Sequence, residues 1–127
     1  MNRIAISTEK APAAVGPYSQ GIRAAGELLF LSGQIPLDPA SGKLVSGGIE
    51  AQTEQACRNV GALLASQGLN FGNVVKTTVF LADMKDFPIV NNIYARYFNA
   101  PCPARSCVQV GALPLGALVE IESIAII

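Results

Sequence analysis

The spacing of hydrophobic and polar positions changes several times along the chain. In the first third, short apolar stretches are separated by turn residues, and residues 22–24 and 28–32 flank Ala25-Gly26-Glu27. This pattern predicts two strands joined by a hairpin turn. Residues 28–31 are apolar without alternation, which is typical of a strand buried on both faces. Turn residues then lead to a short predicted strand at 43–45.

Helical spacing begins after Gly47-Gly48. Apolar residues recur every three or four positions and predict a helix over residues 49–67, with Gly68 as its C-terminal cap. A second helix is predicted over residues 86–98, with Asp86 as N-cap and Pro88 in its first turn. Beta-branched and alternating segments predict strands at 74–81, 105–110 and 118–126.

The order of these elements is strands, helix, strand, helix and two strands. It predicts a single α/β domain over residues 1–127, in which two helices cover one face of a shared sheet. Because the strands are apolar on both faces and only two helices are available, we expect the other face to pack against another subunit.

Composition supports the need for a partner. Of the 127 residues, 50% are hydrophobic and only 14% are charged, against about a quarter charged in an average soluble protein. No stretch reaches the 18 or so apolar residues of a spanning helix, and the first ten residues do not form a secretory signal. Three cysteines, an odd number, favour free thiols in a reducing compartment, and we expect a cytoplasmic protein without membrane contact.

The charged residues and the missing histidine exclude several functions. Nine basic and nine acidic side chains balance, and no basic cluster is present, so nucleic-acid binding is not expected. The chain has no histidine, which removes Ser-His and Cys-His nucleophile pairs, imidazole bases and most zinc sites. Any chemistry must use carboxylates, Arg, Lys, Tyr, hydroxyls, thiols, backbone amides and water.

The last two predicted strands carry a candidate pair of charged groups. Alternation places Arg105 and Cys107 on one face of their strand, and Glu120 and Glu122 on one face of the next. If the two strands form a hairpin, one register sets Arg105 opposite Glu120 or Glu122. An arginine can grip a substrate carboxylate while a glutamate manages a proton or a water. A cross-strand salt bridge explains the same spacing, and spacing alone favours it.

Weaker candidates lie in the turns and in the second helix. Ser32-Gly33 ends a strand with small residues, so its backbone amides are either free to meet an anion or part of an ordinary loop exit. Tyr18 lies in a turn, where its ring either caps a pocket or packs. Asn91 within a helix indicates a specific hydrogen bond or an exposed position. Cys107 is either an activated thiol or a small packing residue.

Taken together, these segments resemble the RidA family, also called YjgF, of reactive-intermediate deaminases, which act on enamines and imines. The resemblance spans nearly the whole chain and rests on ordered motifs at matching spacing. The motifs are residues 11–20, Ser32-Gly33-Gln34-Ile35-Pro36, residues 75–81, residues 91–94, Pro103-Ala104-Arg105-Ser106-Cys107-Val108, and residues 112–114 with Glu120-Ile121-Glu122.

The resemblance implies a chorismate-mutase-like α/β fold: a six-stranded mixed sheet with two helices on one face, assembled as a homotrimeric barrel with sites between subunits. It implies that Arg105 binds the substrate carboxylate and that Glu120 positions or activates water. The pocket would be lined by Tyr18, Ser32, Gly33, Asn91 and Cys107. The connector 99–101 is shorter than usual, and Cys102 replaces a bulkier residue, so both bear on the substrate side-chain preference.

The implied reaction hydrolyses 2-iminopropanoate or 2-iminobutanoate, released by pyridoxal-phosphate dehydratases, to a 2-oxo acid and ammonia, with no cofactor. Imines already react with water, so positioning and modest acid-base help suffice without histidine. Two other functions stay open. One is a non-catalytic module of the same fold that binds small carboxylates or acts as a chaperone. The other, which the neutral charge disfavours, is the endoribonuclease activity attributed to some family members.

Overall fold

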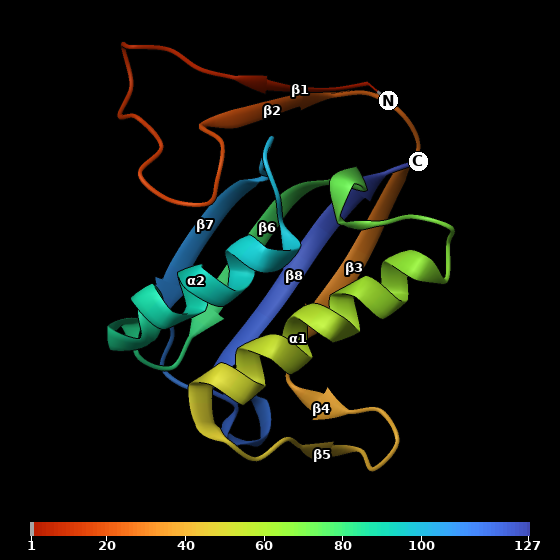
Figure 1. The fold of residues 1–127 in the computed structure, drawn as a ribbon, viewed down its shortest axis with the longest axis vertical. Coiled ribbons are helices and arrows are strands. Elements are labelled where there is room, and N and C mark those ends of the chain that lie inside the picture. The colour runs from red at the N-terminus through yellow and green to blue at the C-terminus, as the bar shows by residue number, and fades with distance from the viewer. Residues whose placement is uncertain (1) are drawn as a thin grey trace.

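The computed structural model describes residues 2–127, in which two helices pack on one face of a four-stranded sheet (Figure 1). The helices are α1 (Gly48–Ala65) and α2 (Phe87–Tyr97), and short 3₁₀ turns cover Phe71–Asn73, Met84–Asp86 and Pro114–Gly116. The strands are β1 (Arg3–Ile6), β2 (Gly21–Ala24), β3 (Leu28–Gln34), β4 (Leu37–Asp38), β5 (Lys43–Leu44), β6 (Val74–Leu81), β7 (Ala104–Gln109) and β8 (Val119–Ile126). The predicted α/β class with two helices on one sheet face is confirmed.

The core lies between the helices and the two central strands. Over residues 77–81 of β6 and 119–125 of β8 every second side chain is buried, as in Val79, Leu81, Val119 and Ile121, which are fully buried. Strand alternation therefore sends these residues toward the helices and sends Glu120 toward the opposite face. This arrangement fixes the side of the sheet on which each candidate residue lies.

The helix boundaries agree with the sequence to within two residues. After α1, the amide of Gly68 donates to the carbonyl of Ala65, and the amide of Leu69 donates to that of Leu64. Gly68 has φ +70°, so this is a Schellman cap with Gly68 in the left-handed position. Asp86 occupies the predicted N-cap position of α2, but its side chain makes no capping hydrogen bond. The side chain of Asp83 caps the preceding 3₁₀ turn instead, by accepting from the amide of Lys85.

The predicted hairpin across Ala25-Gly26-Glu27 does not form. Strand β2 pairs antiparallel with β1, a four-residue strand that the sequence did not indicate, and β3 pairs antiparallel with β8. Pairing with the long β8 places Leu29 and Leu31 against the core. A pairing with β2 would leave them at a short edge ribbon, so burial of apolar surface favours the observed partner.

The hairpin considered for β7 and β8 does not form either. The strand order is β3-β8-β6-β7, so β6 lies between them, parallel to β7 and antiparallel to β8. The reason is the helix α2, which carries the chain from the end of β6 back to the start of β7. Such a helical crossover joins parallel neighbours.

The sheet face opposite the helices is uncovered in the single chain. Leu28 and Phe30 on this face keep 53% and 67% of their surface exposed. The expectation that residues 28–31 are buried on both faces is therefore wrong for one chain alone, whereas the expected uncovered face is present. Neither helix in residues 2–127 combines the length and apolar character that a membrane span requires.

The β1–β2 ribbon lies past the ends of the sheet strands, on the side where β6 and β7 begin (Figure 1). A single bridge joins Ser19, just before β2, to Ala104 at the start of β7, and the Arg3 side chain donates to the carbonyl of Val74 at 3.0 Å. The four-residue pairing of β1 with β2 holds the ribbon together.

Candidate active site

Arg105 lies at the second position of β7, with its side chain toward α2. Its Nη1 donates a hydrogen bond to Oδ1 of Asn91 at 2.8 Å. Its Cζ lies 4.9 Å from the ring centroid of Tyr94, 5.4 Å from that of Tyr18 and 5.5 Å from that of Phe87. Three aromatic rings from the N-terminal loop and α2 therefore surround one guanidinium, which is favourable because the faces of these rings attract cations.

No carboxylate of residues 2–127 forms an ion pair with Arg105. The ion pair found in this part of the chain joins Arg96 to Glu54, at 2.8 Å between α2 and α1. The interpretation of Arg105 as half of a cross-strand salt bridge is therefore wrong. Its positive charge is held by a neutral amide and by aromatic rings, which leaves the charge available for an external anion.

Tyr18 and Cys107 lie on the same side of the sheet as Arg105. The Tyr18 hydroxyl accepts a hydrogen bond from the amide of Val15 at 3.3 Å, which fixes the loop over the guanidinium. Cys107 packs half-buried against the core, and burial raises the pKa of its thiol, although Arg105 opposes the shift. The thiol is therefore protonated at neutral pH, which supports the packing role over an activated nucleophile.

Glu120 forms a second cluster with Gly33, at the far end of the neighbouring strand. A Cβ placed on Gly33 would lie 1.8 Å from Oε2 of Glu120, so only glycine allows the carboxylate this position. The pairing of β3 with β8 shifts register between Leu31 and Gln34. This irregularity takes Ser32 and Gly33 out of the regular ladder, as in a β-bulge.

The seven predicted site residues thus fall into two groups. Arg105, Asn91, Tyr18 and Cys107 form one group, which we call the arginine half-site. Glu120, Gly33 and Ser32 form the other, which we call the glutamate half-site. Strand β6 separates Arg105 from Glu120, and alternation places them on opposite faces of the sheet. Within one chain the two half-sites do not meet.

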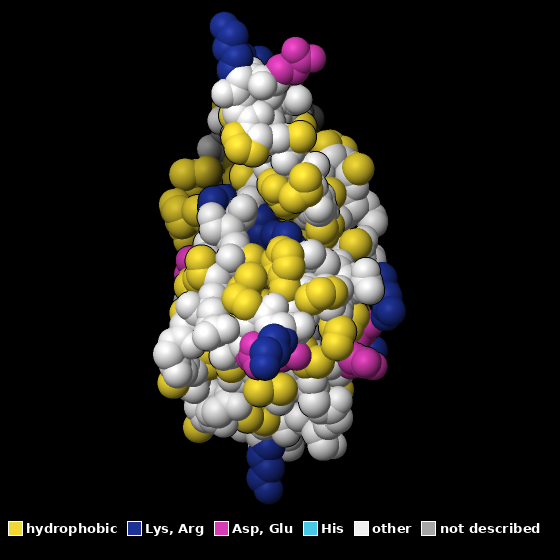
Figure 2. Space-filling model, turned by 90° about the vertical axis from the view of Figure 1, so that its left-hand side faces the viewer, with side chains coloured by type: hydrophobic (Ala, Val, Ile, Leu, Met, Phe, Trp, Pro, Cys, Tyr) yellow, Lys and Arg dark blue, Asp and Glu magenta, His cyan; other side chains and the backbone are white. Residues whose placement is uncertain are grey.

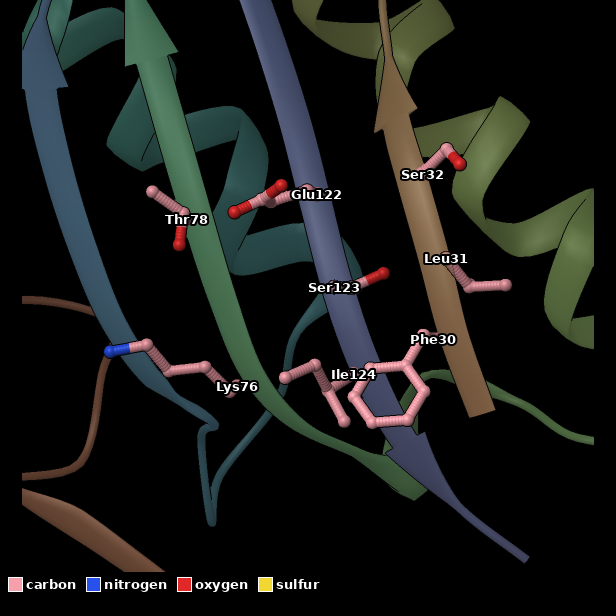
Figure 3. Close-up of a pocket in the computed structure, with 8 residues that line it drawn as sticks. All are labelled: Phe30, Leu31, Ser32, Lys76, Thr78, Glu122, Ser123 and Ile124. Atoms are coloured by element: carbon pink, nitrogen blue, oxygen red, sulfur yellow. The ribbon is translucent and has the colours of Figure 1, made fainter. Parts of the chain in front are cut away.

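A hollow of about 290 Å³ opens on the uncovered face beside the glutamate half-site (Figure 3). Glu122 and Thr78 are direct neighbours across β8 and β6, and the Lys76 side chain extends away from them. The lining residues are Phe30, Leu31, Ser32, Lys76, Thr78, Glu122, Ser123 and Ile124. In residues 2–127, no three His, Cys, Asp or Glu side chains lie close enough together to hold a metal ion.

Three residues near Arg105 were missed in the sequence because they resemble ordinary core positions. No site role was predicted for these residues from the sequence: Phe87 and Tyr94 fit the apolar face of the second predicted helix, and Thr77 fits a central strand, although Tyr94 and Thr77 both lie within family motifs. The spacing of Phe87, Asn91 and Tyr94 contained a usable signal, because positions four and three apart share one helix face. A polar Asn91 between two aromatic residues on that face indicates a buried hydrogen-bond partner.

Comparison with known proteins gives one consistent result. The profile of the family described as Endoribonuclease L-PSP matches residues 8–127. The chain is 58% identical to Reactive Intermediate Deaminase A, chloroplastic, of Arabidopsis thaliana over 94% of this chain and 64% of that protein, so it spans just under two thirds of that relative. It is 54% identical to the 2-iminobutanoate/2-iminopropanoate deaminase of Mus musculus, over 98% of this chain and 91% of that protein.

A solved structure shows the same fold. The structure of TdcF from E. coli with bound serine has a TM-score of 0.76 and 40% identity, covering 98% of both chains. The family match extends from the loop after β1 to the end of the last strand. The chain therefore belongs to the endoribonuclease L-PSP family, which is the RidA or YjgF family of reactive-intermediate deaminases.

Proposed function

We propose that this protein is a 2-iminobutanoate/2-iminopropanoate deaminase, which hydrolyses the C=N bond of small 2-imino acids. The observation that carries the proposal is Arg105, a half-buried guanidinium that has no carboxylate partner among residues 2–127 and is surrounded by three rings. A small carboxylate is the complementary ligand, because it accepts two parallel hydrogen bonds from a guanidinium. The names of the mouse and Arabidopsis relatives supply the reaction class.

In the proposed mechanism, Arg105 holds the substrate carboxylate and Glu120 orients a water molecule. The water oxygen forms a bond to the imine carbon, and its proton passes through Glu120 to the nitrogen. The hydroxyl proton of this adduct then passes through Glu120 to the nitrogen as the C–N bond breaks and the C=O bond forms, so that ammonia leaves and a 2-oxo acid remains. Backbone amides at Gly33 and Cys107 are proposed as further donors to the bound substrate, and Tyr18, Ser32 and Asn91 as its surroundings.

The separation of the two half-sites supports a site shared between subunits. Because Arg105 and Glu120 lie on opposite faces of the same sheet, a complete site needs Arg105 from one copy and Glu120 from the next. The uncovered face, with Leu28 and Phe30 exposed, offers the apolar surface for such contacts. We propose a homotrimer whose sheets, extended to six strands by the β1–β2 ribbon, close into a barrel.

We also propose a cellular compartment for the protein. Cys57, Cys102 and Cys107 are all free, which supports a reducing compartment such as the cytoplasm.

The Ser19 hydroxyl donates to the carbonyl of Cys102, which ties the connector before β7 to the loop that carries Tyr18. We therefore propose that residues near Cys102 influence which side chain the substrate carries.

An endoribonuclease activity, the second candidate, takes its support from the family description alone. Binding to a phosphate backbone needs clustered basic residues. Figure 2 shows Lys and Arg side chains scattered singly among hydrophobic ones on that side of the molecule, and the formal net charge is zero. These observations favour a small carboxylate over RNA.

The test is an ammonia-release assay coupled to a threonine dehydratase, with threonine and serine supplied in parallel. Adding the purified protein should speed ammonia release from the unstable imine above its spontaneous rate. The R105A variant, purified in the same way and shown by circular dichroism to be folded, should not speed ammonia release. A protein that binds 2-oxobutanoate but never accelerates release is a carboxylate-binding module. RNA cleavage that survives R105A and E120Q would contradict the proposal.

A further inference from the structure

The contacts behind Arg105 continue one layer deeper into the core. The hydroxyl of Tyr94 shares a 2.8 Å hydrogen bond with Oγ1 of Thr77, and either oxygen can be the donor. Both residues are fully buried. The Tyr94 ring is the nearest of the three rings to Arg105, at 4.9 Å from Cζ. Tyr94 is thus in contact with the guanidinium, although solvent and substrate do not reach it.

Several contacts fix the orientation of the Tyr94 ring. The ring stacks on that of Phe98, with centroids 4.2 Å apart and planes 18° from parallel. Its hydroxyl is held by Thr77, which is the direct partner of Arg105 in the parallel pairing of β6 and β7. Thr77, which holds the Tyr94 ring in place, is therefore the strand neighbour of Arg105, which the ring contacts.

Burial makes this arrangement sensitive to the loss of a single hydroxyl. Burial raises the pKa of Tyr94 well above its ordinary value, with a smaller opposing effect from the Thr77 hydrogen bond, so the phenol stays neutral. A buried hydroxyl that loses its partner is costly, and the ring must shift to find another. Such a shift would alter the face presented to Arg105 without breaking the bond from Arg105 to Asn91.

We propose that Tyr94 is a positioning residue for the carboxylate-binding arginine, and that the Thr77 hydroxyl keeps Tyr94 in place. The ring face orders the guanidinium before substrate arrives, so less conformational freedom is lost when a 2-imino or 2-oxo carboxylate binds. The inference rests on the proposed function for its substrate class. Its effect is on substrate affinity, because neither Tyr94 nor Thr77 touches the reacting atoms.

Four variants and one control test this role in the imine-hydrolysis assay. Y94L removes the ring, and its KM should rise on the order of tenfold, the value of a cation–π contact between the exposed and fully desolvated cases, while kcat stays within about threefold. T77V should raise KM, T77S should restore it, and T77V/Y94F, which removes both hydroxyls, should lie closer to the parent than T77V alone. The control is Y97L, one turn along α2, whose phenol bonds Glu54 and lies outside the Arg105 contacts.

A second readout separates failure of this inference from failure of the proposed function. The dissociation constant of 2-oxobutanoate, measured by calorimetry, should rise in Y94L and T77V as KM does. If the parent releases no ammonia but binds 2-oxobutanoate, and Y94L weakens that binding, the deaminase proposal fails and the positioning role stands. If Y94L is folded and keeps the parental KM and dissociation constant, the positioning role is wrong. Should Y94L not fold, equal KM values for T77V and T77S overturn it.

Discussion

Gly33 lies so close to Glu120 that the substitution G33A, which adds one methyl group, should have a specific effect on activity. In G33A, the new Cβ would lie 1.8 Å from Oε2, 2.8 Å from Cδ and 3.0 Å from Cγ of Glu120. The carboxylate must therefore retreat by roughly 1.6 Å to reach an ordinary contact of 3.4 Å. Because the clash is with the end of a flexible side chain, the strand itself is not forced to move.

G33A is expected to lower kcat without lowering the stability of the fold. A displacement of about 1 Å from the reacting geometry costs roughly 100-fold in rate, equivalent to about 2.7 kcal/mol, so kcat of G33A should fall by that order. KM should change little, because Arg105 is untouched. Stability should hold or rise by roughly 0.4 to 1 kcal/mol, because alanine restricts the unfolded chain.

The assay is steady-state imine hydrolysis together with thermal unfolding of the same samples. The matched control is G111A, since a Cβ on Gly111 meets nothing within 4 Å. A G33A protein that keeps the parental kcat, with its fold intact, would show that the position of Glu120 does not set the rate. A loss of kcat that tracks a loss of thermal stability would equally refute the reasoning.

Further predictions concern the anchor, the buried thiol and the uncovered face. R105K keeps the charge but loses the planar fork and the geometry of the bond to Asn91, so KM should rise at least about tenfold in the hydrolysis assay. Burial, with a smaller contribution from Glu54, raises the pKa of the Cys57 thiol from 9.0 to about 12. The unfolded chain therefore loses this proton first, and the free energy of unfolding measured with urea should fall as pH rises from about 9 towards 12. C57A should flatten this dependence even if it lowers stability at neutral pH, and an unchanged slope would contradict the assignment. F30E should dissociate the oligomer in light scattering, because Phe30 is 67% exposed in one chain on the face proposed to be covered.

Local structure was predictable because its signals are local. The β-branched, apolar residues of 74–81 predicted β6 to the residue, and Gly68 marked the end of α1 because a left-handed cap favours glycine. Strand pairing was not predictable in the same way. The hairpin expected after β2 does not form because β2 pairs with β1 and β3 with β8, and β1, only four residues long, carries no strong pattern in the sequence.

The residues of the site were predicted better than their grouping. Placing Arg105 opposite Glu120 assumed that consecutive strands pair, whereas α2 carries the chain across so that β6 separates the two. No site role was predicted for Tyr94 or Thr77, because a buried aromatic residue and a strand threonine are typical of any core. Their role depends on the contact with Arg105, which only the three-dimensional structure contains.

Subunit mixing tests most directly whether the arginine and glutamate half-sites of different copies form one active site. R105A and E120Q are each expected to be inactive alone, because every site lacks one half. After exchange of subunits in an equal mixture, a site that combines Arg105 of one variant with Glu120 of the other is whole. Activity should then return to about a quarter of the parental level in a closed trimer. A mixture that exchanges subunits, shown by mass spectrometry, and stays inactive would contradict the shared site.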